Sequence, residues 1–551
     1  MRSMPLAGAP PLEPGWLLGP VVRHRRHATA VVLGAAAALC GLAALVFHFD
    51  AVPVLAGLLA LAAVGVMLLR PELATLLVVL LLYINFPAIL TQRHGLPEWL
   101  AGSFILLLGF PLLRTLVLRR EPFVRDGTLL LMLAFLAVLV LSSVQAIDKA
   151  LALTYVRGYL LEGLLLYWLV VNVIRDGGTL RRAIWTVLAV GSLLSVLCVY
   201  QDLTGSYTQH FGGLALRKFQ EGRDVHMAEP RELRDKREKW DRAQGPVNEP
   251  NRFAQIMVVL VPLAVFMART GRSRLARAGA VAAGLLIVAG VLVTLSRGAF
   301  VTLLVISLAM VTLRWIRPVQ VLLLVLVLAV AAPVVTPFFF KRLQSITAAG
   351  HLLSDDRSQI QEADGAIRGR TTEMLAALHV FRDHPLLGVG PAQFPRFYFF
   401  DYSRNPDIKF KDIQKASRRA HSLYLEMAAE TGAIGLGVFL AIVGTLMRRL
   451  WRARKAWWPD AESPELATAF WLCLLAYLCS AVFLHLSFQR YYWFLVALAS
   501  VAMHVLQQRA ARVRVAPFGA PILDPAEDAG GADVLWRPDP RAPRATREQG
   551  I

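Results

Sequence analysis

Long apolar segments recur along this chain and constrain its fold more than any other feature of the sequence. A helix that crosses the roughly 30 Å hydrocarbon core of a bilayer needs about 20 apolar residues. On that measure the 551 residues contain about fourteen candidate spans. They lie near residues 28–49, 51–69, 73–90, 99–118, 128–146, 153–174, 183–201, 253–268, 278–295, 298–314, 319–336, 422–447, 466–486 and 491–508. With 56% hydrophobic and only 17% charged residues, the sequence predicts an all-α polytopic membrane protein, not a soluble one.

The positions of the cations predict how these spans are oriented. Arg and Lys are concentrated in every second short connection, as cytoplasmic loops require. The basic clusters are Arg23–Arg26, Arg70, Arg114 to Arg125, Arg175 to Arg182, Arg269 to Arg277, Arg314/Arg317, Arg448–Lys455 and Arg509 to Arg514. Both termini are therefore expected in the cytoplasm, with the first span retained as an anchor. Most of the net charge of +20 is an orientation signal beside membrane lipids, and no nucleic-acid partner is expected.

Two connections are too long to be turns, and function is expected there because connecting loops carry most binding residues. Both fall on the outer side and are expected to contain short helices. The charged run 229–242 in the first is interpreted mostly as a solvated surface helix. The predicted segments are a cytoplasmic N-terminal segment (1–27), transmembrane helices (28–201), the first long outer loop (202–252), transmembrane helices (253–336), the large outer loop (337–421), transmembrane helices (422–508) and a disordered cytoplasmic tail (509–551).

The 4 cysteines all lie in apolar stretches, without a CxxC pair or the spacing of metal ligands. A disulfide framework or a zinc site is therefore not expected. No cofactor is predicted.

Charged residues at membrane depth are costly and indicate function by default. Arg157 and Glu162 stand at i and i+5 of one span, about 140° apart around the helix, so each requires a partner on another helix. Arg157 lies close to the outer boundary, where it could face an anion in an outer cavity. The alternative is a side chain that reaches along the helix to the interface.

Arg297 lies between two spans with almost no loop around it, within Thr294-Leu-Ser-Arg-Gly298. The topology places this arginine on the outer side, where the distribution of cations does not explain it. A planar guanidinium suits a phosphate ligand, and Gly298 permits close backbone approach or a tight turn. The alternative is a cation that interacts with the C-terminal end of a helix dipole.

His421 ends the large outer loop, where the next apolar helix begins. The positive end of the helix dipole and the neighbouring Arg418 and Arg419 are expected to disfavour imidazolium. A neutral ring could then act as a general base. The alternative is an interfacial histidine with an ordinary hydrogen-bonding role.

Four sequence patches resemble, in the right order, the O-antigen ligase and O-antigen polymerase superfamily of bacterial inner-membrane glycosyltransferases. The first joins an Arg-x-x-Gly to an Asn-Pro-Asn-like helix start, with Glu249 intruding. The matched patches are Arg242-Ala-Gln-Gly245 with Asn248-Glu-Pro-Asn251, Ser296-Arg297-Gly298, His384-Pro-Leu-Leu-Gly-Val-Gly390, and His421-Ser-Leu-Tyr424-Leu with Glu430-Thr-Gly-Ala-Ile-Gly435. The span count exceeds the family's usual number, and the loop from Arg297 to His421 is long.

The resemblance implies a donor glycan on undecaprenyl pyrophosphate and a hydroxyl acceptor, lipid A-core or another glycan. Arg297, Arg242 and Arg157 would bind the pyrophosphate and stabilise its leaving oxygen. His421 would deprotonate the acceptor as it attacks the anomeric carbon from the opposite face, with inversion in one step. Neither a carboxylate pair nor a metal is required, and no DxD-like acidic pair lies on the outer side.

Supporting roles follow for Ser296 and Asn251, which flank the proposed arginines in the matched patches. Tyr424 and Glu430 orient the base or pack the helix, and packing is the favoured role. His384 belongs to a motif that is equally typical of a turn, since Pro385 fixes φ and the glycines allow unusual angles.

Three functions remain open. The favoured one is a ligase in the bacterial inner membrane, with its active site facing the periplasm and lipid A-core as acceptor. A polymerase or a protein O-oligosaccharyltransferase would share fold and donor and differ in the acceptor. A lipid-linked glycan transporter is the third, although the two halves of the chain show no persuasive inverted repeat.

Overall fold

The structure, a computed structural model, describes residues 70–97, 102–118, 120–206, 208–220, 240–323, 326, 365–402, 418–485 and 489–515. These residues are mostly helical. The first half comprises α3 (Pro71–Tyr83), α4 (Phe86–His94), η2 (Ser103–Leu108), α6 (Gly109–Leu113), η3 (Arg114–Leu118), α7 (Gly127–Ser143), α8 (Lys149–Gly158), η4 (Tyr159–Leu165), α9 (Leu166–Val173), α10 (Gly177–Thr204), η5 (Phe211–Gly213), β1 (Leu216–Gln220) and β2 (Trp240–Gly245). The second half comprises α12 (Pro250–Val258), α13 (Val261–Thr270), α14 (Arg274–Leu292), α15 (Arg297–Thr312), α19 (Gly365–Asp383), α20 (Phe394–Phe397), η7 (Tyr398–Tyr402), α21 (Leu423–Lys455), α22 (Glu462–Ala481) and α23 (Gln489–Val515).

Within the described residues, 7 helices are long and apolar enough to cross a membrane, and each coincides with a predicted span. They are Lys149–Val173, Gly177–Thr204, Pro250–Thr270, Arg274–Leu292, Leu423–Lys455, Glu462–Ala481 and Arg490–Arg512. The chain is therefore a helical membrane protein, as the hydropathy pattern predicts.

The total of about fourteen spans stays a prediction. Predicted segment 73–90 is a pair of helices bent by 56°, and three others, in 99–118, 128–146 and 298–314, are apolar helices of 10–17 residues. Spans 28–49 and 51–69 lie outside the described residues, as does most of 319–336.

Short polar side chains set where several of these helices begin. Each accepts a hydrogen bond from the backbone N–H three residues on, which satisfies a donor that the first helical turn leaves unpaired. The caps are Asp126 for α7, Asp148 for α8, Asp176 for α10 and Ser273 for α14. The polar residue between two apolar runs thus determines the helix boundary.

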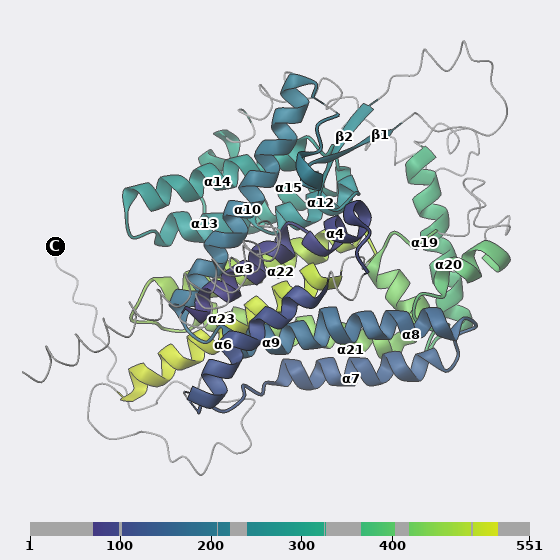
Figure 1. Cartoon of the computed structure of the whole chain (residues 1–551), viewed down its shortest axis with the longest axis horizontal. Coiled ribbons are helices and arrows are strands. Elements are labelled where there is room, and N and C mark those ends of the chain that lie inside the picture. Colours follow the sequence, from purple (N-terminus) through teal and green to yellow (C-terminus); the bar gives the residue numbers. More distant parts are fainter. Residues whose placement is uncertain are drawn as a thin grey trace, which may run out of the picture. The chain divides into compact units, whose positions relative to one another are not determined.

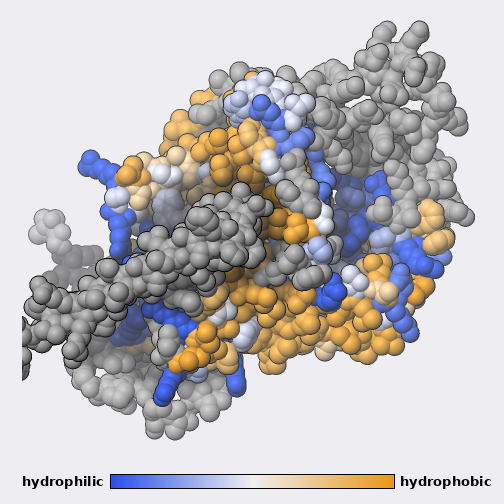
Figure 2. Space-filling model, viewed as in Figure 1, coloured by the Kyte–Doolittle hydropathy of each residue, from blue (hydrophilic) through white to orange (hydrophobic). Residues whose placement is uncertain are grey.

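The long helices pack side by side, α10 on α14, α13 on α14 and α22, and α21 on α7 and α22 (Figure 1). Apolar side chains remain exposed on the outward surfaces of α7, α10 and α14, among them Leu130, Leu193 and Leu285. Figure 2 shows broad hydrophobic patches in this region. Such extensive exposed apolar surface is expected where lipid chains, not water, contact the protein.

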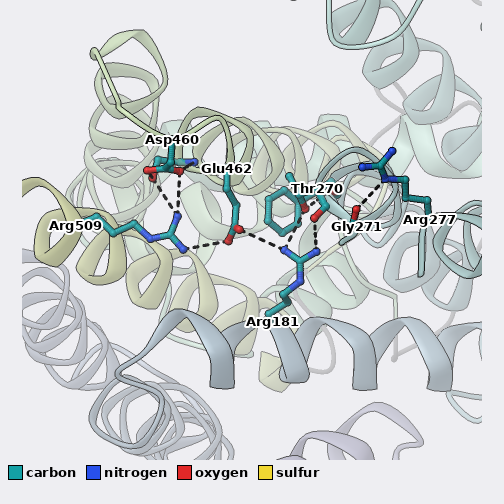
Figure 3. A network of polar contacts seen from close by, with 9 residues as sticks. Arg181, Thr270, Gly271, Arg277, Asp460, Glu462 and Arg509 are labelled. Carbon is teal, nitrogen blue, oxygen red and sulfur yellow. Dashed lines mark hydrogen bonds and ion pairs between the residues drawn. The ribbon is translucent and has the colours of Figure 1, made fainter. Parts of the chain in front are cut away.

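One end of the helix bundle, which we call the basic end, is joined by arginines (Figure 3). Arg181 of α10 donates to the Thr270 carbonyl at 2.7 Å and lies 3.6 Å from Glu462 of α22. Arg509 of α23 contacts the same carboxylate at 3.0 Å, and Asp460 at 3.4 Å. Cations that the sequence places on one side of the membrane therefore do lie together.

The opposite end, which we call the site end, carries a two-stranded antiparallel sheet. Strands β1 and β2 pair with Leu216 opposite Gly245 and Gln220 opposite Trp240. The predicted surface helix over 229–242 is therefore wrong for its last three residues, which are β2; the rest lies outside the described residues. Pairing with β1, a contact distant in the sequence, overrides the local helical charge pattern.

Residues 385–390, which follow α19, lie against α21 at a break in that helix. Gly432 has φ 67° and ψ −170°, which interrupts the helical hydrogen bonds. The N–H groups of Val389 and Gly390 donate to the carbonyls of Ala429 and Glu430, at 3.0 and 2.9 Å. In return the Ala433 N–H donates to the Pro385 carbonyl at 2.8 Å. The His-Pro-x-x-Gly-x-Gly motif thus attaches α19 to the helix that follows His421.

Candidate functional site

The turn between α14 and α15 places Arg297 at the site end. Helix α14 ends at Leu292 and α15 begins with Arg297, so the connection is as tight as the sequence predicts. Arg297 is half-buried, and Gly298 faces Phe483, whose ring would lie 3.2 Å from a Cβ added at that glycine. A larger residue at position 298 would have to displace the ring.

Arg242, from strand β2, is buried beneath this turn. Its Nε donates to the Thr294 carbonyl at 2.8 Å, and its Nη2 donates to Asn251 Oδ1 at 2.9 Å. The Ala243 N–H also donates to the Val293 carbonyl, at 3.2 Å. Arg242 therefore joins the sheet, the start of α12 and the turn that carries Arg297.

A small, partly open pocket, with room for about one water molecule, adjoins this turn. Its walls are rich in hydrogen-bond donors and come from four separate parts of the chain. The lining residues are Asn251, Gln255, Ser296, Gly298, Ala299, Arg370, Ser480, Phe483 and Leu484. Ser296 and Asn251, two supporting residues named by the resemblance, thus line the same pocket. In the sequence, Arg297 stands between the lining residues Ser296 and Gly298.

Arg370 of α19 brings a cation into the pocket wall from the large outer loop. Beside it, the Nε2 of Gln255 is buried and has no hydrogen-bond partner in the described part of the chain. Guanidinium and amide N–H groups only donate, so the wall is complementary to a ligand rich in acceptor oxygens. A phosphate or pyrophosphate group has that chemistry.

His421 directly precedes α21, with its backbone in the left-handed region at φ 49°. Its Nδ1 lies 2.5 Å from Glu373 Oε2 and 3.0 Å from the Arg419 carbonyl oxygen. The Glu373 side chain, on α19, is only 1% exposed, and its other oxygen lies 2.8 Å from Arg418 Nε. The carboxylate contacts are close charge contacts without hydrogen-bond alignment.

Both arginines beside His421 contact buried carboxylates. Arg418 contacts Glu373, and Arg419 donates from Nε to Glu426 at 3.0 Å. Burial opposes the charge on Arg419, but Glu426 outweighs it and raises the pKa of Arg419 above its ordinary value. The prediction for His421 considers only two arginines and a helix dipole. In the structure, the carboxylate of Glu373 also lies beside the ring.

His485 connects His421 to the pocket. Its ring meets that of His421 edge-on, with centroids 5.9 Å apart, and it directly follows the lining residue Leu484. Burial lowers the pKa of His485 well below its ordinary value, and the nearby charges of Arg419 and Arg252 lower it further. His485 is thus neutral near pH 7, and buried Arg252 donates to its carbonyl oxygen.

Left-handed backbone at residues other than glycine gathers at this end of the protein. Asn248, Leu295 and His421 have φ of 55°, 51° and 49°. Such conformations cost of order 1 kcal/mol or more and tend to persist where function requires them. Asn248 and His421 lie in matched patches, and Leu295 directly precedes the patch that contains Arg297.

The other predicted site residues lie elsewhere or serve packing. Arg157 is exposed on α8 and does not line the pocket. Tyr424 donates to the Leu478 carbonyl at 2.8 Å, and Glu430 accepts from the Phe394 N–H at 3.4 Å, which is consistent with the packing roles favoured for both. His384 is exposed in the loop. Glu162, as expected of a carboxylate at membrane depth, is paired with another helix, 2.8 Å from Arg490.

The sequence analysis missed Arg370, Glu373 and His485. The first two lie at i and i+3 on α19, so they occupy neighbouring positions on one side of a helix. An amphipathic segment ending just before the His-Pro motif is the signal that could have identified them. His485 had no such signal, since it follows an apolar span without a motif.

A match to a known protein family covers part of this site. The family model described as O-Antigen ligase matches residues 282–440, which include Arg297, Arg370, Glu373 and His421. No curated protein matches the chain. Residues 282–440 of this chain are therefore similar to the O-antigen ligase family.

Proposed function

We propose that this protein is a glycosyltransferase that moves a glycan from undecaprenyl pyrophosphate to a hydroxyl of lipid A-core. The observation that carries the proposal is a donor-lined pocket close to the His421–His485 ring pair, with Arg370 of the pocket wall and His421 both inside the segment that matches the O-antigen ligase family. The hydrogen-bond donors of the pocket wall are complementary to the oxygens of the donor's diphosphate. The histidine can accept the proton of the acceptor hydroxyl.

Arg370 and Arg297 would bind the diphosphate, together with the polar groups of Ser296, Asn251 and Gln255. The breaking bond joins the anomeric carbon to a phosphate oxygen. Positive groups close to that oxygen stabilise the negative charge that develops on it as the bond breaks. Two nitrogens of Arg242 already bond to protein oxygens, so its proposed role changes from direct ligand to support of Arg297. Arg157 is not part of this proposal.

The reaction proceeds by direct displacement. The acceptor oxygen attacks the anomeric carbon while the bond from that carbon to the phosphate oxygen breaks, and its electrons pass to the leaving undecaprenyl pyrophosphate. The acceptor proton moves to Nε2 of His421. Attack opposite the leaving group inverts the anomeric configuration, and the step requires no metal.

The site end is proposed to face the periplasm of a bacterial inner membrane, with both termini in the cytoplasm. The basic end then faces the cytoplasm, in agreement with the positive-inside rule. This orientation brings the site to the side where an exported lipid-linked glycan meets lipid A-core.

The test is reconstitution of the purified protein with an undecaprenyl-pyrophosphate-linked oligosaccharide and lipid A-core. Wild type should produce glycan joined to lipid A-core, and His421→Ala should lose transfer while inserting normally into membranes. Full transfer by His421→Ala would exclude the proposed base. Longer carrier-linked chains, with lipid A-core unmodified, would assign polymerase activity instead.

A further inference from the structure

We propose that Glu373 is the positioning residue of His421: it keeps the imidazole in the tautomer with the proton on Nδ1 and stabilises the imidazolium formed during transfer. The inference rests on the proposed function. It is carried by a contact between α19 and the segment before α21 that no sequence motif indicates.

Glu373 is buried, so its carboxylate depends on nearby positive groups. The side chain of Glu373 is 1% exposed and lies 2.8 Å from Arg418 Nε and 2.5 Å from His421 Nδ1. A buried carboxylate requires partners, because an unpaired ion in a low-dielectric interior is strongly destabilising. Arg418 supplies one charge partner of this carboxylate, and the His421 ring, once positive, supplies a second.

The surroundings of Nδ1 determine the tautomer. Both groups closest to Nδ1 are acceptors, the Glu373 carboxylate and the Arg419 carbonyl oxygen at 3.0 Å. A lone pair on Nδ1 would face both and be repelled. The proton therefore resides on Nδ1, and Nε2 keeps the lone pair that a general base requires.

The other charged groups near the His421 ring have their own partners, so Glu373 is the carboxylate that can stabilise the imidazolium. Arg419 is paired with Glu426, and His485 is neutral near pH 7. Arg252, behind His485, donates to Gln255 Oε1 at 3.1 Å and lies 3.5 Å from Glu249. When Nε2 takes the acceptor proton, the new positive charge faces Glu373 directly, and the proton later leaves to water or to the departing pyrophosphate.

The decisive variant is Glu373→Gln, which preserves shape and removes charge. Arg418 only donates, so it would attract the amide oxygen and turn the amide NH₂ toward Nδ1. An N–H donor at Nδ1 favours the opposite tautomer, with Nε2 protonated and unable to accept. We expect kcat to fall by about 10²- to 10⁴-fold, the range for loss of general base catalysis, while KM for the lipid-linked oligosaccharide changes less than about twofold.

A pH profile separates this role from simple structural support. With the carboxylate removed, the acidic limb of kcat/KM should move to lower pH, because imidazolium loses a stabilising neighbour. Glu373→Asp, which restores the charge, should recover part of the activity and return the limb toward that of wild type. Glu426→Gln is the matched control: it removes another buried carboxylate of the same region, but one that contacts Arg419 and not the ring.

The outcomes are distinct. An inactive His421→Ala with a Glu373→Gln variant that keeps wild-type kcat and pH profile would overturn the role of Glu373 and leave the proposed function standing. Equal losses in Glu373→Gln and Glu426→Gln, without movement of the acidic limb, would also overturn it, because they indicate structural support alone. Transfer by His421→Ala would instead refute the proposed function itself.

Discussion

The guanidinium of Arg242 donates to the carbonyl oxygen of Thr294 at 2.8 Å, so strand β2 supports the turn that carries Arg297. The same side chain also bonds to Asn251 in the pocket wall. Lysine offers a single ammonium in place of the planar fork and cannot reproduce both bonds.

Arg242→Lys is therefore expected to lower kcat/KM for the lipid-linked donor by about 10- to 100-fold, the equivalent of one lost charge-assisted hydrogen bond. The measurement is steady-state transfer to lipid A-core in reconstituted membranes. Arg277→Lys is the matched control, because it breaks another bond from an arginine to a carbonyl oxygen, to Gly271 at the basic end. Comparable losses of kcat/KM in both variants would contradict a specific role of strand β2.

Arg370 is expected to contribute to donor binding from the pocket wall. Arg370→Ala should raise the apparent Kd for an undecaprenyl pyrophosphate analogue by about 10- to 100-fold, because charge-assisted bonds to phosphate contribute about 1.5–3 kcal/mol. Arg382→Ala removes an exposed arginine from the same helix and should bind normally. Unaltered binding by Arg370→Ala would remove this residue from the proposed diphosphate site.

The break in α21 is expected to be specific for glycine. At Gly432 an alanine Cβ would meet the backbone of Leu386, and φ is 67°, a conformation that disfavours side chains. Gly432→Ala should lower the free energy of unfolding by about 1–3 kcal/mol, measured as thermal unfolding in detergent. Gly437→Ala lies in the same helix with nothing within 4 Å of the added Cβ and should be neutral or stabilising. Equal stability of the two variants would contradict the proposed packing of the loop on the break.

Acid is expected to destabilise the protein through His485. Its pKa is lowered in the folded state by burial and by nearby arginines, so between that value and about 6.5 the unfolded chain binds more protons than the folded one. This contribution is fully present above about pH 6.5 and is lost as pH falls, by at most about 1.4 kcal/mol per pH unit.

The measurement is the unfolding midpoint between pH 7.5 and 5.5, about one unit on each side of the ordinary histidine value. His485→Gln should show a smaller decline than wild type over this interval. An identical decline in both proteins would assign the acid sensitivity to other groups.

Chelation is expected to leave transfer unchanged, because the proposed step uses arginines to stabilise the pyrophosphate. The measurement is transfer by protein dialysed against EDTA, with and without added Mg²⁺ or Mn²⁺. Loss of activity on chelation that either ion restores would show that a metal supplies part of the charge stabilisation.

The fold could be predicted from the sequence wherever hydropathy alone determines the structure. Span 183–201 falls within α10, and span 466–486 largely within α22, because uninterrupted apolar runs have few alternatives in a bilayer. The sheet could not be predicted, because β1 and β2 pair across the segment between Gln220 and Trp240, beyond the range of local sequence patterns. Local charge spacing cannot report such a pairing.

The site was predictable in part for a similar reason. Arg297 and His421 stand out as polar residues at the ends of apolar spans, and their neighbours match family motifs. Glu373 and Arg370 lie instead within a polar helix, where many side chains have the same local character. Only the attachment of α19 to α21 selects the two that face the pocket and His421.

The break at Gly432 divides α21 mechanically into two parts. Residues 385–390 bond to both parts, to Ala429 and Glu430 before the break and, through Pro385 and Leu386, to Ala433 and Ile434 after it. Bilayers of different thickness impose different tilts on a long helix. Because residues 385–390 bond to both parts of α21, a change in the tilt of this helix would also move the segment that follows α19.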